Sequence, residues 1–314
     1  MRLGRREGTP ILPMHIASIH IHPVKSLRAL RLEEARFDEL GLENDRRFLI
    51  VERDGKAVTQ RGDPRLALIA TSLTAETLRL ELPGGGGVEV PLRTPRGTQP
   101  ARVAAEVWRA SGMLADDCGE EAARWLSAFV GRPVKLVRVG EAFSRPMPVR
   151  KMPAGLAHEA APAAAFPAVH ASLGTDEATS HRVAFADAYP FLMLGEASLA
   201  QLNARLEAAG CAPVPMDRFR ANLIVADAEA HEEDALGQFM IGGAGPFVAA
   251  GGCDRCIMTT TDQATGERNA EPLRTLAGYR RNPAKPSEVL FGQNLLHLAK
   301  DGMIKVSDRV TRLA

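Results

Sequence analysis

The residues with the clearest chemical potential are the two cysteines of the run Cys253-Asp254-Arg255-Cys256, which follows Gly251-Gly252. Cysteines at this spacing can bind a metal or exchange a disulfide, because the thiolate is both a soft ligand and a nucleophile. A structural zinc site would need a second pair of ligands, and Cys118 and Cys211 stand far apart. A thioredoxin-like pair should open a helix, whereas a β-rich threonine run follows here. Taken alone, the pair could also be two inert, buried cysteines.

Two histidines offer a second candidate for metal binding. His20 and His22 alternate along a predicted strand and would therefore share one of its faces. Two histidines without a third ligand are more often surface residues or hydrogen-bonded strand residues. The sequence therefore favours the structural interpretation of this pair.

The elements that must position these residues are mostly short strands. Alternating or β-rich runs between turn residues predict strands over Ile16–Val24, Phe48–Val51, Leu66–Ile69, Leu78–Leu82, Val88–Val90, Leu223–Ala226, Phe239–Ile241, Ile257–Thr260 and Met303–Val306. Apolar residues at helical spacing predict helices over Glu120–Val130 and Ala197–Ala209, ending at Gly131 and Gly210. Clustered strands and few helices predict an α+β, β-rich fold built around β-barrels, rather than alternating βαβ units.

A change of composition divides the chain into two predicted domains. Proline and alanine are concentrated between Ser144 and Ala168, a composition that disfavours regular helix and interior strand. We therefore predict an N-terminal β-barrel domain at residues 14–138, a Pro/Ala-rich linker or loop at 139–168, and a second β-barrel domain with a few flanking helices at 169–312.

The overall composition is that of an ordinary globular protein. Of 314 residues, 45% are apolar. The 39 Lys and Arg balance 38 Asp and Glu, so the chain lacks the excess positive charge with which proteins bind a nucleic acid polymer. Neither a Gly-x-Gly-x-x-Gly nor a Walker motif follows a predicted strand. Four cysteines are too few for a disulfide framework and fit a reducing compartment. With no apolar run of ~18 residues and no secretory signal in Met1–Met14, we predict a cytoplasmic protein without membrane association.

Five motifs place the cysteine pair in a wider pattern. In chain order they are Pro23-Val24-Lys25-Ser26, Asn44-Asp45-Arg46-Arg47-Phe48, Asp217-Arg218-Phe219-Arg220-Ala221-Asn222, the run from Cys256 through Asp262 to Gly266, and Phe291-Gly292-Gln293. Together they resemble the MOSC (molybdenum cofactor sulfurase C-terminal) domain family with its N-terminal β-barrel partner. The resemblance covers the chain from about Ile16 to Val310, and it is strongest to the family's amidoxime-reducing members and their bacterial counterparts.

The resemblance implies a molybdenum cofactor, in which molybdopterin holds the metal. Cys256 matches the cysteine whose thiolate binds molybdenum beside the pterin dithiolene, and a soft thiolate suits a metal already held by sulfur. Cys253 would then be a packing neighbour. The turn at Asp254 would bring backbone groups close to the cofactor.

The resemblance also implies which residues bind the organic part of the cofactor. Its phosphate needs cationic and hydroxyl donors, and guanidinium groups supply planar, bidentate ones. The matching positions are Lys25, Ser26, Arg46, Asp187, Ala188, Arg220, Asn222, Asp254 and Asn294. Ala188 could offer only backbone groups, and Ala221 stands where the family's Phe-Arg-Pro-Asn motif has proline. Taken singly, the cations could equally form structural ion pairs.

The function that the resemblance implies is reduction of N-hydroxylated compounds such as amidoximes, hydroxylamines and N-hydroxylated bases. The electrons would come from an external ferredoxin or flavin-linked reductase, since the sequence has no cysteine after Cys256 for an iron–sulfur cluster. Two alternatives stay open. The protein could be a non-catalytic carrier of the molybdenum cofactor, or a sulfurtransferase with a persulfide on Cys256.

Overall fold

Strands form most of the regular structure, and this confirms the β-rich α+β prediction. The computed structural model describes residues 13–156, 159–160, 167–172 and 177–313. In chain order the strands are β1 (His15–Ile21), β2 (Leu30–Leu32), β3 (Glu34–Asp38), β4 (Gly41–Leu42), β5 (Phe48–Val51), β6 (Ala70–Leu73), β7 (Thr77–Glu81), β8 (Gly87–Pro91), β9 (Arg102–Val107), β10 (Ala110–Asp117), β11 (Lys135–Arg138), β12 (Pro146–Pro148), β13 (Ala178–Arg182), β14 (Phe191–Gly195), β15 (Leu223–Ala226), β16 (Gln238–Ile241), β17 (Ala244–Asp254), β18 (Arg281–Asn282), β19 (Lys285–His297), β20 (Gly302–Lys305) and β21 (Val310–Arg312).

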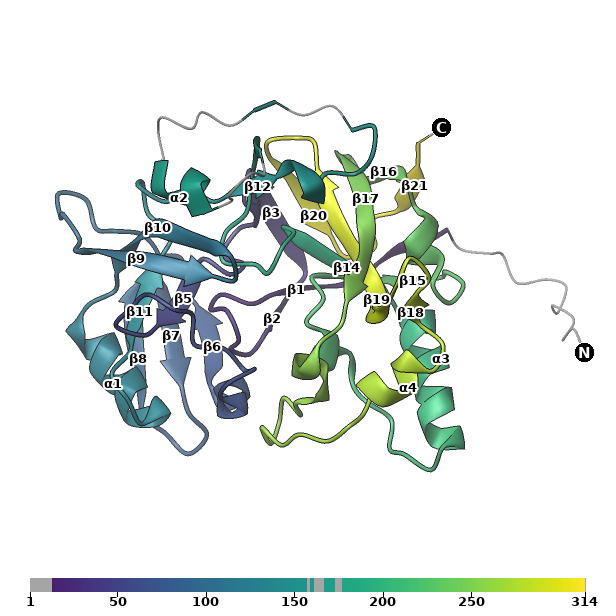
Figure 1. Ribbon diagram of the computed structural model, residues 1–314, viewed down its shortest axis with the longest axis horizontal. Coiled ribbons are helices and arrows are strands. Elements are labelled where there is room, and N and C mark those ends of the chain that lie inside the picture. Colours follow the sequence, from purple (N-terminus) through teal and green to yellow (C-terminus); the bar gives the residue numbers. More distant parts are fainter. Residues whose placement is uncertain (1–12, 157–158, 161–166, 173–176, 314) are drawn as a thin grey trace, which may run out of the picture.

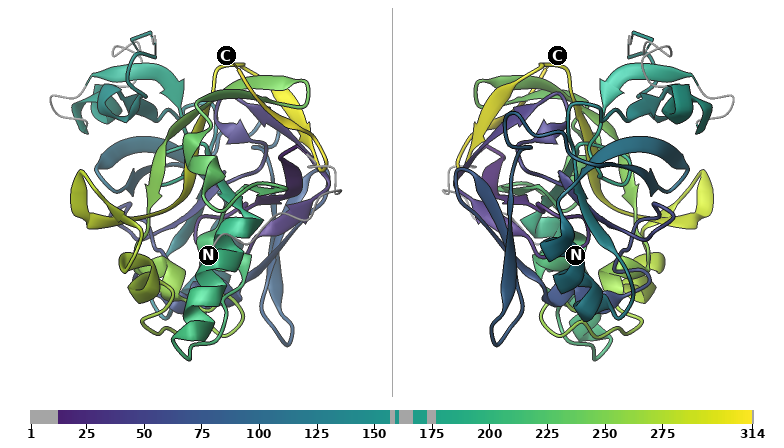
Figure 2. Two further views of the ribbon diagram at one scale, coloured as in Figure 1. Left: turned by 90° about the vertical axis from the view of Figure 1, so that its right-hand side faces the viewer. Right: turned by 90° about the vertical axis from the view of Figure 1, so that its left-hand side faces the viewer.

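Helices are short in the described part of the chain. The α-helices are α1 (Glu120–Val130), α2 (Pro167–Ser172), α3 (Glu196–Ala208) and α4 (Leu273–Ala277), and the 3-10 helices are η1 (Pro64–Leu68), η2 (Val149–Lys151), η4 (Met216–Phe219), η5 (Glu232–Ala235) and η6 (Ile257–Thr260). The two side views of Figure 2 show α3 on one side of the molecule and α1 on the other. None of the helices in the described part of the chain has the length and apolar content needed to span a bilayer.

The largest sheet is a half-barrel that joins the two ends of the chain. Its nine strands in the described residues include the path β2-β1-β15-β14-β19-β17-β16-β21, and β18 pairs with β19. Strand β3 pairs with β20 in a separate three-stranded sheet, and β1 is antiparallel to β15 in the nine-stranded one, so early residues complete sheets formed mainly by later ones. In Figure 1 the purple strands accordingly lie beside green and yellow ones. Phe37, Phe191, Phe239 and Phe247 fill its core.

Strands β5 to β11 form a second body, on the left of Figure 1. One sheet has the order β5-β11-β10-β9 and another the order β6-β7-β8. Helix α1 covers these strands because its buried residues, among them Leu126 and Val130, share one face and pack in the same cluster as Phe48. Gly131 then ends the helix in a left-handed conformation, as predicted.

Two predicted strands are wrong, and side-chain hydrogen bonding explains both. Residues 66–69 lie largely in η1, because Asp63 caps the backbone N–H of Arg65 and Pro64 favours the first helical position. Residues 257–260 form η6, where the hydroxyls of Thr259 and Thr260 donate to carbonyl oxygens three residues earlier. Threonine hydroxyls that bond locally compete with a strand ladder.

The two longest strands, β17 and β19, escape prediction and carry part of the site. They pair antiparallel from Phe247 opposite His297 to Asp254 opposite Leu290, with irregularities near Gly252. Glycine and proline within these strands obscure the alternation on which prediction depends. The predicted linker, residues 139–168, contains β12 and η2, while residues 157–158 and 161–166 lie outside the described part.

The predicted histidine pair does not share a strand face. His20 lies in β1, where its ring is hydrogen-bonded to the Ser18 hydroxyl at 3.0 Å. His22 follows the end of β1 and lies buried, with its ring 3.7 Å from Asp45. The two imidazoles therefore lie in different surroundings, one on a strand and one buried beside a carboxylate.

Candidate functional site

One cavity of about 300 Å³ brings the sequence-predicted site residues together. A volume of this size is at the lower end of the range for small-molecule sites, about 300–1,000 Å³. The predicted residues on its lining are Lys25, Ser26, Arg46, Asp187, Ala188, Arg220, Asn222, Asp254, Cys256 and Asn294. We call this space the first cavity. The fold therefore brings all ten predicted residues to one cavity.

Cys256 lies on the lining at the end of β17, where the chain turns into η6. Its thiol is partly buried and accepts a hydrogen bond of 3.2 Å from the guanidinium of Arg61. The same nitrogen of Arg61 donates to Asp187 at 3.3 Å. The thiolate is the form of cysteine that binds metals.

Asp187 organises the cationic groups around it. Its carboxylate accepts hydrogen bonds from the ammonium of Lys25 and from the indole N–H of Trp108, the latter at 3.1 Å. Burial alone would raise the pKa of Asp187, but Lys25 and Arg61 hold it well below its ordinary value. Lys25 also donates to the carbonyl of Phe185 at 2.8 Å. Burial, opposed by Asp187, lowers the pKa of Lys25 to about 8.

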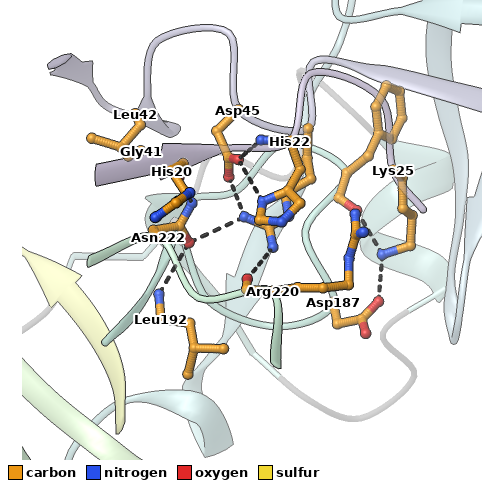
Figure 3. A network of polar contacts seen from close by, with 12 residues as sticks. His20, His22, Lys25, Gly41, Leu42, Asp45, Asp187, Leu192, Arg220 and Asn222 are labelled. Carbon is orange, nitrogen blue, oxygen red and sulfur yellow. Dashed lines mark hydrogen bonds and ion pairs between the residues drawn. The ribbon is translucent and has the colours of Figure 1, made fainter. Parts of the chain in front are cut away.

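Arg46 is the centre of a second network, which Figure 3 shows from close by. Its guanidinium donates to Asp45 at 2.6 Å, to the side-chain oxygen of Asn222 at 3.1 Å and to the carbonyl of Arg220 at 3.0 Å. Burial would raise the pKa of Asp45, but Arg46 and His22 hold it well below its ordinary value. These bonds join the turn between β4 and β5 to the turn before β15.

Arg220 and Asn222, both labelled in Figure 3, complete this network from the turn before β15. The guanidinium of Arg220 donates to the carbonyl of Leu27 at 2.8 Å, and burial, followed by repulsion from Arg46, lowers its pKa to about 9. The amide of Asn222 donates to the carbonyl of His20 at 3.1 Å. Arg46 and Arg220 both have positive φ, near 50°, a conformation that non-glycine residues adopt at a cost.

The remaining predicted residues lie on β17, on β19 and just before β14. Asn294 donates to the carbonyl of Gly252 at 3.3 Å, and Asp254 accepts the backbone N–H of Val289 at 3.1 Å. Ala188 reaches the lining beside Asp187. Cys253, predicted as a packing residue, is partly buried, accepts a hydrogen bond from Arg255 and also lines the cavity.

Sequence reasoning missed several residues of the site. The additional charged or aromatic residues at or beside the cavity include Arg61, Trp108, Arg145, Lys151, Arg218 and Arg255. Arg145 donates to the carbonyls of Ala184, at 3.0 Å, and of Asp187, at 3.1 Å, and so fixes the loop that carries Asp187. Burial lowers its pKa to about 10. Locally, Arg61 is marked only by the turn residues after it, and its cysteine partner is 195 positions away.

The donor set of the first cavity fits a molybdenum cofactor. Its lining has seven cationic side chains against three acidic ones, as an anionic phosphate requires. Ser26 is 1% exposed, and its hydroxyl has no hydrogen-bond partner among the described residues. A buried polar atom without a partner is costly, so a ligand oxygen at this point would satisfy it. The thiol of Cys256 supplies a soft metal ligand at the same cavity.

Comparison with known proteins finds relatives along nearly the whole sequence. Residues 14–133 match the MOSC N-terminal beta barrel domain, and residues 180–311 match the MOSC domain. The chain is 33% identical to mitochondrial amidoxime-reducing component 1 of Homo sapiens, over 98% of this chain and 84% of that protein, and 33% identical to its Mus musculus counterpart, over 94% and 81%. It is 28% identical to a molybdenum cofactor sulfurase of Danio rerio, over 94% of this chain and 33% of that protein.

Proposed function

The chain belongs to the MOSC-domain family that includes the mitochondrial amidoxime-reducing components, and from this membership we propose that it is a molybdenum-cofactor-dependent reductase of N-hydroxylated compounds. Its substrates would be amidoximes, hydroxylamines or N-hydroxylated bases. The observation that carries the proposal is the convergence of Cys256, the orphaned hydroxyl of Ser26 and a ring of cations on one cavity. A cytoplasmic location, supported by the few free cysteines, is part of the same proposal.

Each residue of the first cavity has a separable role in this proposal. Cys256 supplies the protein's metal ligand, and Arg61 stabilises its thiolate by a hydrogen bond. Lys25 and Arg220 offer charged donors to the phosphate, and Ser26 adds a hydroxyl. Arg46 holds the backbone of Arg220 in position. These partners are fixed before the ligand arrives, so binding costs little ordering of side chains.

The chemistry at the site divides between the protein and the group that it binds. When bound, the molybdenum cofactor supplies the oxygen-atom transfer that breaks the N–O bond of the substrate. The overall reaction consumes two electrons and two protons for each N–OH group, and it yields N–H and water. We propose an external ferredoxin or flavin-linked reductase as the source of the electrons.

Metal content and turnover test the proposal directly. Protein produced in a host that makes molybdopterin should contain about one molybdenum per chain and reduce benzamidoxime with an artificial electron donor. Cys256→Ala should lose metal and turnover by more than about 100-fold, since even second-shell changes at metal sites cost about 10–100-fold. The matched control is Cys253→Ala, three positions away, which should retain both. Protein that holds no molybdenum under these conditions contradicts the proposal.

The alternatives predict different results in the same preparation. Similarity to a molybdenum cofactor sulfurase favours sulfur transfer as the second candidate. A persulfide on Cys256 in metal-free protein, detected by mass spectrometry, would support sulfur transfer. Stoichiometric molybdenum with no turnover of any N-hydroxylated compound would support a cofactor carrier.

A further inference from the structure

A second cavity, of about 340 Å³, adjoins the first at Cys256. The two share Arg61, Asp187 and Cys256, and also Lys151, Ala188 and Asp254. Its other lining residues come from the β9–β10 hairpin, from the segment 145–150 and from Val183. The thiol of Cys256 therefore stands between a cation-rich, buried space and a second space with different walls.

The walls of the second cavity are largely apolar. Trp108, Pro146, Met147, Pro148 and Val183 provide flat or aliphatic surface on its lining. Trp108 is 57% exposed, which is unusual for a large aromatic side chain that is tied to the molecule by a hydrogen bond. The guanidinium carbon of Arg61 lies 4.2 Å from the centre of its ring, so the indole is held in one orientation.

The position of Trp108 in its hairpin is itself informative. Val107 and Ala110 pair across β9 and β10, so Trp108 and Arg109 form a two-residue loop. Trp108 has φ of 58°, and glycine is the usual first residue of such a loop when φ is positive. A bulky residue in this conformation is retained at a cost, which is typical of residues held in place for function.

The rim of the second cavity is cationic. Arg109, Arg150 and Lys151 lie on its lining. The acidic residues of the lining are Asp187 and Asp254, and Asp187 is already matched by Lys25 and Arg61. Apolar walls beneath a rim of excess positive charge suit a ligand that is flat and apolar in its body and anionic at one end.

We propose that the second cavity binds the body of the substrate and selects N-hydroxylated compounds whose planar aromatic ring carries an anionic substituent, a carboxylate or a phosphate. This inference rests on the proposed function. The ring lies against Trp108 and the proline wall, with its N–OH group toward Cys256. The anionic substituent lies toward Arg109 and Lys151. A carboxylate and a phosphate are both anions that these cations can bind, and the two pairs of probes in the binding experiment distinguish them.

Fluorescence of Trp108 provides a binding test that does not depend on turnover. The chain has two tryptophans, so Trp125→Phe leaves Trp108 as the sole indole emitter. Molybdenum-loaded Trp125→Phe protein is titrated with benzamidoxime and 4-carboxybenzamidoxime, and then with N4-hydroxycytidine and its 5′-monophosphate. We expect every probe to quench the emission. The anionic member of at least one pair should bind about tenfold more tightly, a preference that added salt reduces.

Arg109 supplies the matched variant, because it lines the second cavity and not the first. Arg109→Gln should reduce the preference for the anionic probe about threefold. Arg124→Gln removes the same charge from the exposed face of α1 and should leave the preference unchanged.

The outcomes separate this inference from the proposed function. Equal affinities within both pairs, or titration without quenching, overturn the inference, even where benzamidoxime is reduced. A preference for the anionic probe that Arg109→Gln weakens supports the cavity assignment. If that preference occurs without any reduction of benzamidoxime, the proposed reductase activity fails and the binding specificity stands.

Discussion

The two cavities that meet at Cys256 are built in opposite ways. In the first, Lys25 is 6% exposed and Ser26 and Asn222 are each 1% exposed, and Lys25 and Asn222 are hydrogen-bonded to backbone carbonyls. In the second, the principal wall is an indole that is 57% exposed at the tip of a hairpin. A preorganised polar site suits one fixed ligand, whereas an open apolar wall accepts variation. The difference predicts that substitutions in the first cavity affect folding and cofactor retention, and those in the second affect substrate choice.

The largest effect is expected for Arg46→Ala. This substitution leaves Asp45, 4% exposed, without its principal cationic partner, and removing one member of a buried ion pair costs about 3–5 kcal/mol. We expect the free energy of unfolding, measured in urea near neutral pH, to fall by about 3 kcal/mol. Arg124→Ala, on the exposed face of α1, should change it by less than about 0.5 kcal/mol.

The pH dependence of the Arg46→Ala defect provides an independent check. Arg46 holds the pKa of Asp45 below its unfolded value, so its stabilising contribution is present above about pH 4 and is lost as pH falls. The difference between wild type and variant should therefore shrink in acid. A variant within about 1 kcal/mol of wild type at neutral pH would show that the first cavity is less rigid than its contacts indicate.

Arg61 tests the boundary between the two cavities. Its guanidinium bonds to Cys256 and Asp187 and stacks on Trp108, so one substitution disturbs both spaces. Arg61→Gln should lower turnover about 10–100-fold, because hydrogen bonds to charged groups contribute about 1.5–3 kcal/mol. Arg61→Lys retains the charge but not the planar fork, and it should recover only part of the loss. Full recovery by lysine would show that charge alone is required.

Deprotonation of Lys25 is expected to have a smaller effect, on the retention of molybdenum as pH rises. Its pKa of about 8 means that it loses its proton as pH rises through that value, and the first cavity then loses a cation. We expect molybdenum retained after dialysis to fall about threefold between about pH 7 and about pH 9.5. Lys25→Arg should remove this dependence, since arginine stays charged. Identical profiles for the two proteins would exclude Lys25 as a phosphate ligand.

The free energy of unfolding should depend on pH in the opposite direction to molybdenum retention. An unfolded lysine titrates near about 10.4, so between about 8 and 10.4 the unfolded chain binds more protons at Lys25 than the folded chain does. The contribution of Lys25 to the free energy of unfolding therefore rises with pH over this window. Affinity for the anion falls over the same window.

Prediction from sequence succeeded where the pattern is local. The strand over residues 223–226 and the helix over residues 120–130 have the predicted bounds. A short apolar, β-rich run defines the strand, and helical spacing with a terminal glycine defines the helix. It failed over residues 257–260, where threonine hydroxyls bond to nearby carbonyls. Long strands β17 and β19 were missed because glycine and proline interrupt their alternation.

In the candidate site, too, prediction succeeded for residues in local motifs and failed for a residue defined by long-range contacts. Ordered motifs identified Lys25, Arg46, Arg220 and Cys256, and the fold brings them to one cavity. Arg61 belongs to no recognised motif, and its importance follows from its hydrogen bonds to Asp187 and Cys256, both more than a hundred positions away. Long-range pairing of this kind depends on strand order, which no local pattern specifies.

The smallest effect on stability, and the sharpest separation of stability from function, is expected for Trp108→Gly. Glycine adopts positive φ readily, so the hairpin loop gains about 1 kcal/mol from relief of backbone strain, against the lost contacts of a half-exposed indole. We expect the melting temperature to change by less than about 4 °C, while KM for aromatic N-hydroxylated substrates rises about tenfold. Trp108→Phe should retain most of the affinity, because a flat aromatic wall remains. If KM for benzamidoxime is unchanged in Trp108→Gly, the exposed indole has no part in substrate binding, and the contrast between the two cavities reduces to one of burial alone.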